Sequence, residues 1–590
     1  MTTYSTFRRT FAAASTVALV GFGSVVFATP ASAADFPNVD TETELVDAID
    51  AANGDSEADV IYLTGTGFTL TMGDLPKVTS DITFVGPGSG SFTIDGGGNE
   101  VFNLFGPPGT PPDVVISGVT ITNAATVASE DANLALTDVH VLSGGLYFAR
   151  GNLHIAGSVF ENAGGHGARI EVENSQIVHI EDSTFDDNGV FGLRIDAYGS
   201  TSITLDNLFA NGNGDDGIHL YAEDDSVVTV NTFGADNNVG DGMSIYSGGA
   251  ADITVNDATS RSNGYQGLEV FAEGAQAAIT LNRTVSTDNG DEGIDIDVVD
   301  GAQVNVSGAD IRLNSPGIGI GAESNGGLVS IDAATIDDNI YISGGGVNID
   351  AIGVDVAISN STISNNRSLG GAGVSATLDP EGSLTIVNST ISGNHAGDSE
   401  GAIFVRAGQE PGGEFILAHS TVTDNHSDEN AAISIWEGIS ASISHSIVAG
   451  NTGGTGDLEL LSADGTIDYS LIEAPGPEAQ TAAEAGTGNV LGFAAGLGPL
   501  ADNGGPTLTH VPLATSRALS AGDPNVTGEP ATDQRGSARV VGVIEIGAVE
   551  VEATLAATGT DPNSALLSGI VALGFGMLLL AGAAWRKTGA

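Results

Sequence analysis

The stretch Ser183-Thr-Phe-Asp-Asp-Asn188, followed by Gly192-Leu-Arg-Ile195, decides the fold. An asparagine returns along the chain at intervals of 25 or 26 residues that lengthen near the end. The series is Asn162, Asn188, Asn213, Asn238, Asn263, Asn289, Asn314, Asn339, Asn366, Asn394, Asn425 and Asn451. A period of roughly 20 to 50 residues indicates stacked repeats. Because each repeat alternates apolar and polar residues without a helical pattern, we predict an all-β coil of short strands.

The recurring asparagines have a structural explanation. Identical side chains on successive rungs of such a coil lie about 4.8 Å apart, so that their amides can form a hydrogen-bonded ladder. The Gly that follows four residues later is expected to supply a turn conformation closed to other residues. Four histidines near these turns lack metal-ligand spacing and are expected to be surface residues. They are His395, His419, His426 and His445.

Composition limits the partners of the chain. The 590 residues contain 84 Gly and no Cys, and the formal net charge is -59. Such a charge makes nucleic acid and anionic membranes poor partners, and without Cys no disulfide can form. We interpret the acidity mainly as a source of solubility outside the cell.

The N-terminus predicts export. Arg8 and Arg9 precede an apolar stretch over 11–27 and a small-residue site at Ala31-Ser-Ala33. This order is typical of a secretory signal peptide over residues 1–33, cleaved between Ala33 and Ala34. A permanent N-terminal membrane anchor is the alternative, but Gly and Ser interrupt the apolar stretch.

The C-terminus predicts attachment to the cell wall. Residues Leu555, Ala556, Ala557, Thr558 and Gly559 precede an apolar segment over 565–584 and a basic tail, all within a region over 551–590. About 20 apolar residues can span a membrane as a helix, and the basic tail would stay cytoplasmic. The alternative is a permanent tail anchor.

This C-terminal motif resembles the L-A-x-T-G cell-wall sorting signals of actinobacteria. The resemblance implies that a sortase cleaves after Thr558 and joins its carboxyl group to a peptidoglycan amine. The implied partners are sortase and cell-wall peptidoglycan. The implied location is secreted and covalently wall-anchored, with a precursor transiently in the plasma membrane.

The region after the signal resembles right-handed parallel β-helix proteins. Residues Leu45-Val-Asp-Ala-Ile49 form an amphipathic pattern, and the turn Thr93-Ile-Asp-Gly-Gly-Gly98 is common in early rungs of that group. The resemblance implies an N-terminal capping helix and first rungs over 34–113, followed by β-helix repeats over 114–475. A cap would protect an open coil end from pairing with other chains.

Residues 476–550 change in composition. The stretches Asp502-Asn-Gly-Gly-Pro506, Thr532-Asp-Gln-Arg-Gly536 and Ile546-Gly-Ala-Val-Glu550 resemble the choice-of-anchor Q module. That module closes β-helical surface proteins of many bacteria ahead of an anchor. We therefore predict a C-terminal β module there, with a role in capping and spacing.

Register between the repeats predicts columns of outward-facing side chains. The fourth residue after successive Gly residues gives Tyr221, Tyr246 and Phe271 beside carboxylates such as Asp241. Flat apolar rings with nearby acceptors suit a carbohydrate-binding face. The alternative is that these aromatic residues stabilise the coil by packing on one another across neighbouring strands.

One local set combines acids, a base and cations: Asp215, Asp216, His219, Arg194 and Arg169. Paired carboxylates can hydrolyse glycosides, with one held protonated and the other activating water. Polygalacturonases use similar elements, but here the His and Arg elements precede the acidic pair, in reversed order, and the family's Lys is missing. Stacked carboxylates could also recruit Ca²⁺, although no cofactor is required.

These patterns predict a sortase-anchored surface protein that adheres to extracellular polysaccharide or matrix through its β-helix. A wall-tethered polysaccharide hydrolase or lyase is the alternative, and a passive stalk or coat protein is a third. Whether the protein is an enzyme stays open, with binding favoured. A strongly acidic surface disfavours uronic-acid polymers as ligands.

Overall fold

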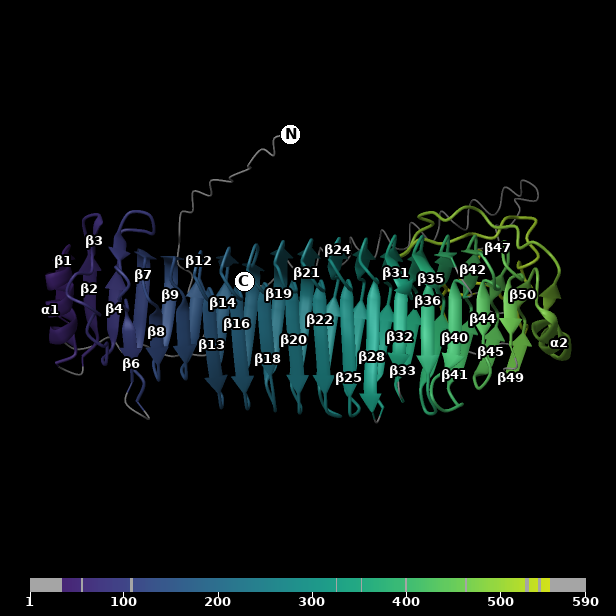
Figure 1. The fold of residues 1–590 in the computed structure, drawn as a ribbon, viewed down its shortest axis with the longest axis horizontal. Helices are drawn as coiled ribbons and strands as arrows, with labels where there is room; N and C mark the ends of the chain where they lie inside the picture. Colours follow the sequence, from purple (N-terminus) through teal and green to yellow (C-terminus); the bar gives the residue numbers. More distant parts are fainter. Residues whose placement is uncertain are drawn as a thin grey trace, which may run out of the picture. The chain divides into compact units, whose positions relative to one another are not determined.

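Figure 1 shows a computed structural model of the chain. The structure describes residues 34–551 apart from 55–56, 107–109, 325, 352, 398–399, 462–463, 526–529 and 540–542. The predicted signal peptide with Ala33, the sorting motif Leu555 to Gly559 and the apolar segment 565–584 lie outside the described residues. Within the described part, no helix is both long and apolar enough to cross a membrane. The chain forms two compact units, residues 1–328 (unit 1) and 329–590 (unit 2).

Unit 1 begins with a short strand and a helix. The helix α1 (Glu42–Ala52) starts at Thr41, whose side chain accepts a hydrogen bond from the backbone N of Glu44 at 3.3 Å. Glu44 in turn accepts from the backbone N of Asp40 at 3.1 Å, so that a capping box fixes the start of the helix. Leu45 and Ile49 are fully buried. The helix predicted around these residues is confirmed, while its role as a cap stays a prediction.

The repeats of unit 1 place one strand each on a continuous parallel face, called sheet B here. Its strands are β6 (Asn103–Phe105), β8 (Val127–Glu130), β10 (Leu146–Ala149), β13 (Ala168–Glu173), β16 (Leu193–Tyr198), β18 (Ile218–Ala222), β20 (Met243–Gly248), β22 (Leu268–Glu273), β25 (Ile294–Val299) and β28 (Ile318–Ser324). Each strand pairs in parallel with the strand one repeat later, so one register runs along the face.

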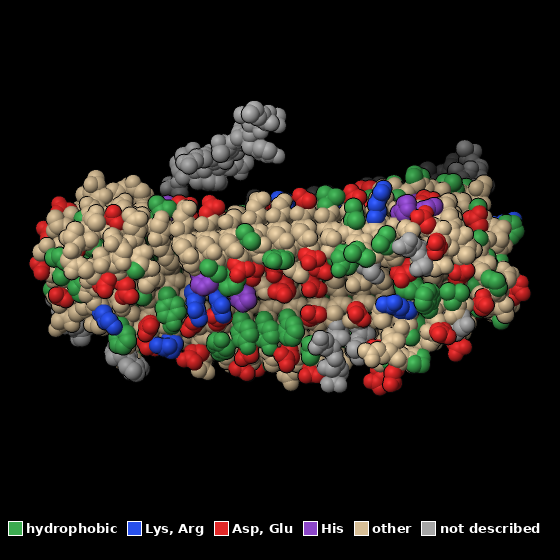
Figure 2. Space-filling view, viewed as in Figure 1, with side chains coloured by type: hydrophobic (Ala, Val, Ile, Leu, Met, Phe, Trp, Pro, Cys, Tyr) green, Lys and Arg blue, Asp and Glu red, His purple; other side chains and the backbone are tan. Residues whose placement is uncertain are grey.

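The remaining strands of unit 1 form sheet A on the other sides of the coil. They are β1 (Asp35–Val39), β2 (Asp59–Leu63), β3 (Gly67–Thr69), β4 (Ile82–Val85), β5 (Thr93–Asp95), β7 (Asp113–Thr122), β9 (Asn133–Leu142), β11 (Leu153–Ala156), β12 (Val159–Glu161), β14 (Ile177–Glu181), β15 (Thr184–Asp186), β17 (Ser202–Phe209), β19 (Val227–Asp236), β21 (Asp252–Arg261), β23 (Ala278–Asn282), β24 (Val285–Thr287), β26 (Gln303–Ser307) and β27 (Asp310–Arg312). The chain thus forms the predicted all-β parallel β-helix. Asp and Glu side chains are spread over the surface seen in Figure 2, whereas Lys and Arg are few.

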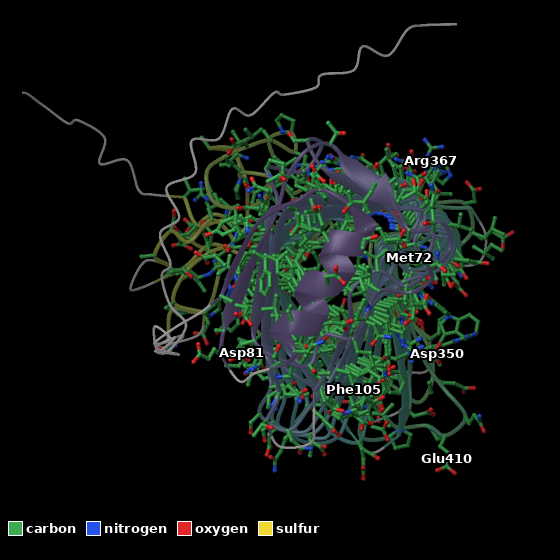
Figure 3. The ribbon with its side chains drawn as sticks, turned by 90° about the vertical axis from the view of Figure 1, so that its left-hand side faces the viewer. Met72, Asp81, Phe105, Asp350, Arg367 and Glu410 are labelled. Carbon is green, nitrogen blue, oxygen red and sulfur yellow. The ribbon has the colours of Figure 1, made fainter. Side chains whose placement is uncertain are left out.

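Alternate side chains of most strands fill the interior of the coil. On β16 and β18, Leu193, Ile195, Ile218 and Leu220 are fully buried, while the residues between them face outward. Buried rings also stack across rungs, as Phe160 and Phe185 do with 5.0 Å between ring centroids. Figure 3 shows side chains filling the coil and α1 crossing its near end.

The asparagine ladder is present inside unit 1. Asn238 illustrates its bonds: its backbone N and its Nδ2 donate to Oδ1 of Asn263 at 2.9 and 3.0 Å, and Nδ2 also donates to the carbonyl O of Ala210 at 3.0 Å. Asn188, Asn213, Asn238, Asn263, Asn289 and Asn314 are all buried. Asn162 does not belong to the ladder, because it is exposed and has a φ of 58°. Ala163 takes the ladder position and donates its backbone N to Asn188.

The glycines after the ladder residues have a different cause from the predicted one. Gly217 has no positive φ, and the same holds for Gly192, Gly242 and Gly267. A Cβ at Gly217 would lie 2.6 Å from the carbonyl O of Gly242 and 2.9 Å from Nδ2 of Asn238. Close approach of the neighbouring rung therefore requires Gly here. The left-handed conformation falls instead on the residue before each ladder asparagine, such as Asp187 with a φ of 56°.

Unit 2 is also a coil of parallel β-strands. Its strands are β29 (Leu328–Asp332), which begins at the unit boundary, β30 (Thr335–Asp337), β31 (Ile340–Ser343), β32 (Val347–Ala351), β33 (Asp355–Ser359), β34 (Thr362–Ser364), β35 (Arg367–Gly370), β36 (Val374–Leu378), β37 (Ser383–Val387), β38 (Thr390–Ser392), β39 (His395–Ala396), β40 (Ile403–Ala407), β41 (Glu414–Ala418), β42 (Thr421–Thr423), β43 (His426–Ser427), β44 (Ile433–Ile435), β45 (Ser440–Ser444), β46 (Ile447–Val448), β47 (Thr452–Gly453), β48 (Leu458–Leu460), β49 (Asp464–Asp468), β50 (Leu471–Ile472) and β51 (Val490–Leu491). The ladder in this unit joins Asn339, Asn366, Asn394, Asn425 and Asn451. The second helix, α2 (Pro477–Ala485), packs against β48 and β49.

The C-terminal segment lies against the outside of unit 2. Gln534 donates to the carbonyl O of Ser361 at 3.1 Å and accepts from Thr390 Oγ1 at 2.6 Å, while His510 Nε2 lies 2.8 Å from Ser392 Oγ. In the described residues from 492 to 551 the pairing is limited to isolated bridges between single residues. The predicted C-terminal β module is therefore mostly irregular chain, held to β34 and β38 by side-chain hydrogen bonds.

Two histidines predicted at the surface are buried beneath this segment. His419 and His445 are 4% and 7% exposed, and their rings stack with 4.6 Å between centroids. His445 Nε2 accepts from the backbone N of Asp523 at 3.2 Å. The surface prediction was wrong for these two because residues distant in sequence cover them.

Candidate functional site

The predicted outward columns exist on sheet B of unit 1. Successive strands place the second position after each Gly in one line, Arg169, Arg194, His219, Ser244, Glu269 and Asp295. A second line contains Glu171, Asp196, Tyr221, Tyr246, Phe271 and Asp297. Figure 2 shows Arg and His side chains beside a hydrophobic patch on this surface, with acidic side chains around them. Parallel register thus brings residues from six repeats to one face.

The two arginines of this face, Arg169 and Arg194, centre on a buried acid. Arg194 Nε donates to Asp196 Oδ2 at 2.9 Å, and its NH2 group donates to Oδ1 at 3.0 Å. Arg169 reaches the same Oδ2 at 4.0 Å and pairs with Glu171 at 2.5 Å. The side chain of Asp196 is 5% exposed, whereas those of Arg169 and Arg194 are 41% and 31% exposed. The buried Asp196 therefore fixes Arg194, the partly exposed Glu171 holds Arg169, and both guanidinium groups remain accessible to solvent.

A stack of rings borders the arginines. Phe191 lies between His166 and His219, with ring centroids 5.2 and 4.9 Å apart and nearly parallel planes. Burial, and then the charges of Arg194 and Arg169, lower the pKa of His166. The neutral imidazole is thereby favoured. Asp196, His166 and Phe191 were absent from the predicted site set, although each stands in a column that the repeat defines.

The acidic pair adjoins this stack. Asp216 Oδ2 lies 3.4 Å from His219 Nδ1, and Asp216 Oδ1 accepts the backbone N of Asp241 at 2.9 Å. Asp241 in turn accepts the backbone N of Gln266 at 2.8 Å. Asp216 and Asp241 are each 7% exposed. Both carboxyl groups therefore hold neighbouring rungs together, whereas Asp215 is half-buried, and burial together with Asp216 raises its pKa.

Burial raises the pKa of Asp241 to about 8, and the charges of Asp216 and Glu269 add to the effect. Two further acids on this face behave alike: burial raises the pKa of Glu292 to about 8 and that of Asp295 to about 6. At neutral pH Asp241 therefore carries its proton. A protonated carboxyl can donate a hydrogen bond or act as a general acid.

The raised pKa of Asp241 makes the stability of unit 1 depend on pH. Because the folded pKa lies above the unfolded value of about 3.9, the stabilising contribution of Asp241 is fully present below about pH 4 and is lost as the pH rises through 8. Asp241→Asn keeps the acceptor for Gln266 and carries no charge. We expect it to raise the free energy of unfolding by about 1 to 3 kcal/mol at pH 8 and to change it little at pH 4.

Urea denaturation at both pH values, followed by circular dichroism, measures this effect. The exposed Asp252→Asn on β21 is the matched control. A gain of equal size at pH 4 and pH 8 would show that Asp241 is ionised in the folded protein.

The aromatic column is in register but differs from the predicted open platform. Tyr221 and Tyr246 stack with 4.5 Å between centroids, and Tyr246 and Phe271 with 5.2 Å, at interplanar angles of 6° and 7°. All three are half-buried. The ring faces cover one another, so the stack presents edges and hydroxyl groups outward. The packing alternative therefore accounts for these three rings.

The hydroxyl groups of this stack are bound to acids. Tyr221 donates to Glu223, and Tyr246 donates to Glu273 at 2.8 Å. Burial and then the hydrogen bond to Glu273 raise the pKa of Tyr246 to about 12. Tyr198 departs from the pattern: it is 43% exposed and its ring is tilted by 52° from that of Tyr221. Tyr198 therefore offers more open ring surface than the predicted three.

A shallow hollow lies near the edge of this face. Its volume is about 330 Å³, and its lining includes Asp131, Asn133, Arg150, Asn152 and Gln176. Arg150 is paired with Asp131 at 2.8 Å. The predicted site residues do not line it. The site is thus an exposed face suited to an extended ligand.

Metal-ligating groups of three or more residues occur twice in the described part of the chain. They are His154 with His179 and Glu181, and His395 with His426 and Asp428. Asp216 and Asp241 belong to neither, since they bond to backbone amides of the next rung. Binding of Ca²⁺ at the acidic turns stays a prediction.

Comparison with known proteins identifies the coil. Residues 112–284 match the family model described as the right handed beta helix region. This agrees with the predicted handedness and covers strands from β7 to β23. No curated protein has significant similarity to the chain.

Three solved structures are similar to the β-helix. The A-module of mannuronan C-5 epimerase AlgE6 from Azotobacter vinelandii is 18% identical, with 69% of this chain and 96% of that chain covered and a TM-score of 0.31. The PL6 family alginate lyase AlyGC is 11% identical, with 78% of this chain and 93% of that chain covered and a TM-score of 0.26. Pectate lyase Pel9A is 12% identical, with 85% of this chain and 90% of that chain covered and a TM-score of 0.18. At these identities and TM-scores, the likenesses carry no argument about the site.

Proposed function

We propose that this protein is a wall-anchored extracellular β-helix that binds polysaccharide on sheet B of unit 1, between β13 and β22. The observation that carries the proposal is the pair Arg169 and Arg194, held by Glu171 and Asp196 respectively, with both guanidinium groups still accessible. They lie on adjacent rungs beside His219 and the exposed Tyr198. Such a face offers donors, acceptors and a ring surface to one ligand.

The shape of the face supports an extended ligand. From β13 to β22 it crosses four rung intervals, or about 19 Å at roughly 4.8 Å each. Donors and acceptors repeat at every interval, so that a chain of sugar hydroxyl groups can meet them in sequence. The arginines locally balance the carboxylates of Glu171 and Asp196, so a ligand oxygen meets less negative charge here than the net charge of -59 implies.

Anchoring would present this face outside the cell. In the proposal, sortase recognises Leu555 to Gly559, cleaves after Thr558 and joins the protein to peptidoglycan. We expect Thr558→Ala to move the protein from the wall fraction to the membrane fraction or the medium, as seen by fractionation and immunoblotting. Unchanged covalent linkage to the wall would contradict the anchoring part of the proposal.

The binding part is tested by isothermal titration with a panel of neutral and acidic polysaccharides. The double variant Arg169→Gln/Arg194→Gln is expected to weaken binding roughly 100-fold, since each charge-assisted hydrogen bond contributes about 1.5 to 3 kcal/mol. Arg283→Gln is the matched control, because Arg283 pairs with Asp257 on sheet A at 2.7 Å. A chain that binds no glycan of the panel would be a passive stalk.

A second candidate function is polysaccharide cleavage. It rests on Asp241, which is protonated at neutral pH, standing one rung from Asp216 and His219. A protonated acid beside a second carboxyl group is the arrangement that glycosidases use. Release of reducing ends or unsaturated uronides, abolished in Asp216→Asn, would establish an enzyme. Binding of polysaccharide without cleavage would contradict the enzyme and support the adhesin.

A further inference from the structure

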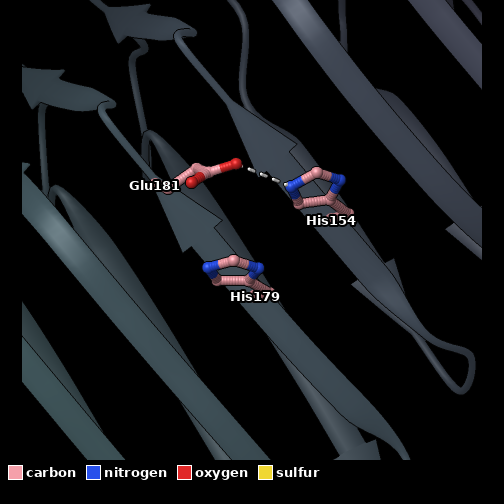
Figure 4. Close-up of side chains that lie close together, drawn as sticks. All are labelled: His154, His179 and Glu181. Carbon is pink, nitrogen blue, oxygen red and sulfur yellow. Dashed lines mark hydrogen bonds and ion pairs between the residues drawn. The ribbon is translucent and has the colours of Figure 1, made fainter. Parts of the chain in front are cut away.

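Two imidazoles and two carboxylates meet on sheet A, away from the sheet B face. His154 on β11 and His179 on β14 are in direct register, and their rings stack with 5.2 Å between centroids. Glu181 follows His179 by two residues and points to the same side of β14 (Figure 4). His154 Nε2 lies 3.2 Å from Glu181 Oε1. Adjacent rungs thus supply the two rings and the acid to one point.

A second carboxylate borders the group. Asp206 on β17 is in register with Glu181, and its Oδ2 lies 3.2 Å from His179 Nε2. The side chains are partly exposed, His154 at 24% and His179 at 30%. Solvent ions can therefore reach the imidazoles without opening of the coil.

We propose that His154, His179 and Glu181 form a Zn²⁺ site, with Asp206 as a neighbouring oxygen donor. One ligand atom from each of the three lies within 4.8 Å of the others. Two ligands bound to one tetrahedral zinc ion at about 2.1 Å lie about 3.4 Å apart, so the most separated pair needs to close by at most about 1.4 Å. A small rotation of half-exposed rings provides that movement.

The ligand types select the ion. Imidazole nitrogen suits zinc and other late first-row metals, whereas Ca²⁺ and Mg²⁺ take oxygen ligands. Zn²⁺ has no geometric preference from its d electrons and accepts two nitrogens and carboxylate oxygen in a tetrahedral site. A bound ion would link β11 to β14, and through Asp206 to β17.

The chain contains close comparisons. His140 and Glu161 form a His–carboxylate pair at 3.0 Å on the same sheet, but among the described residues no second imidazole joins them. The other three-residue group, His395, His426 and Asp428, is more exposed. His426 there already contacts Thr452 and Asp428 through its two nitrogens, each at 3.0 Å.

The test is isothermal titration of the chelator-treated full chain with zinc chloride, in a His395→Ala/His426→Ala background that removes the second group. We expect one bound zinc per chain. His154→Gln and His179→Gln should each weaken binding at least about tenfold, Asp206→Asn less, and His140→Gln not at all. Cobalt chloride added to the same proteins gives a visible absorption spectrum that reports nitrogen and oxygen ligation independently of heat.

Several outcomes would overturn the site. They are no zinc bound in this background, affinity unchanged in His154→Gln and His179→Gln, or equal loss in His140→Gln. Circular dichroism melting of each variant without metal excludes unfolding as the cause of a loss. If a histidine variant has a lowered melting temperature, the cobalt spectrum of Glu181→Gln decides instead. Glu181 is 40% exposed, so its substitution is expected to change the stability of the coil little.

Discussion

Asn238→Ala is expected to lower the free energy of unfolding of unit 1 by about 3 to 5 kcal/mol. The substitution removes the acceptor for the backbone N and Nδ2 of Asn213 and the donor to the carbonyl O of Ala210. These groups are buried, and each unsatisfied polar group costs about 1 to 3 kcal/mol. Urea denaturation monitored by circular dichroism measures the loss, and hydrogen exchange locates it.

The control stands in the same repeat. Asn231 also forms a ladder, donating to Asp206 and accepting from Asn256, but it is half-buried at the surface of sheet A. Asn231→Ala should cost less than about 1 kcal/mol because water replaces the lost bonds. Equal effects of the two substitutions would contradict a special role for the internal ladder.

Arg539→Ala is expected to release the C-terminal segment from unit 2. Arg539 is 9% exposed, pairs with Glu550 at 3.5 Å, and donates to Asn388 Oδ1 at 2.9 Å and to the carbonyl O of Gly547 at 3.0 Å. Removing one partner of a buried ion pair costs about 3 to 5 kcal/mol, since the remaining charge is left without compensation. We expect this cost to weaken the docking of residues 501–550 onto unit 2 and to leave the stability of the coil itself unchanged.

Limited proteolysis distinguishes these two places. We expect new cleavage within 501–550 in Arg539→Ala, while fragments of the coil remain intact. Arg517→Ala is the control, because Arg517 is exposed and its contact is with the ring of Phe493. Cleavage spread through the repeats of unit 2 would mean that the segment stabilises the coil as a whole.

The repeat predicted the fold well because period and register are local properties. Alignment of successive glycines placed Arg169 beside Arg194 and Tyr221 beside Tyr246, as the strand pairing has them. The asparagine ladder followed from the same spacing. The reason for the regularly recurring glycine, as at Gly217, could not be predicted from the spacing. The glycine is required by close contact with the next rung and not by its dihedral angle.

Other features depend on information that a period does not contain. Arg194 donates to Asp196, two residues away on its own strand. This contact orients the arginine on which the proposed binding face depends, and the period of the repeat does not predict it. Asp523 donates to His445 from 78 positions later, and His419 stacks on His445, so the burial of these two rings could not be read from their repeats. His154 and His179 share a column. Asn162, however, stands one position before the ladder position held by Ala163, so alignment on the asparagines sets the two histidines one residue out of register.

The central claim is that the arginine face on sheet B of unit 1 binds polysaccharide. The most direct measurement compares the affinity of the wild-type chain, Arg169→Gln/Arg194→Gln and Arg283→Gln for the tightest glycan of the panel by isothermal titration. We expect a loss of roughly 100-fold in the double variant and none in Arg283→Gln. Equal affinity in all three proteins would contradict the claim.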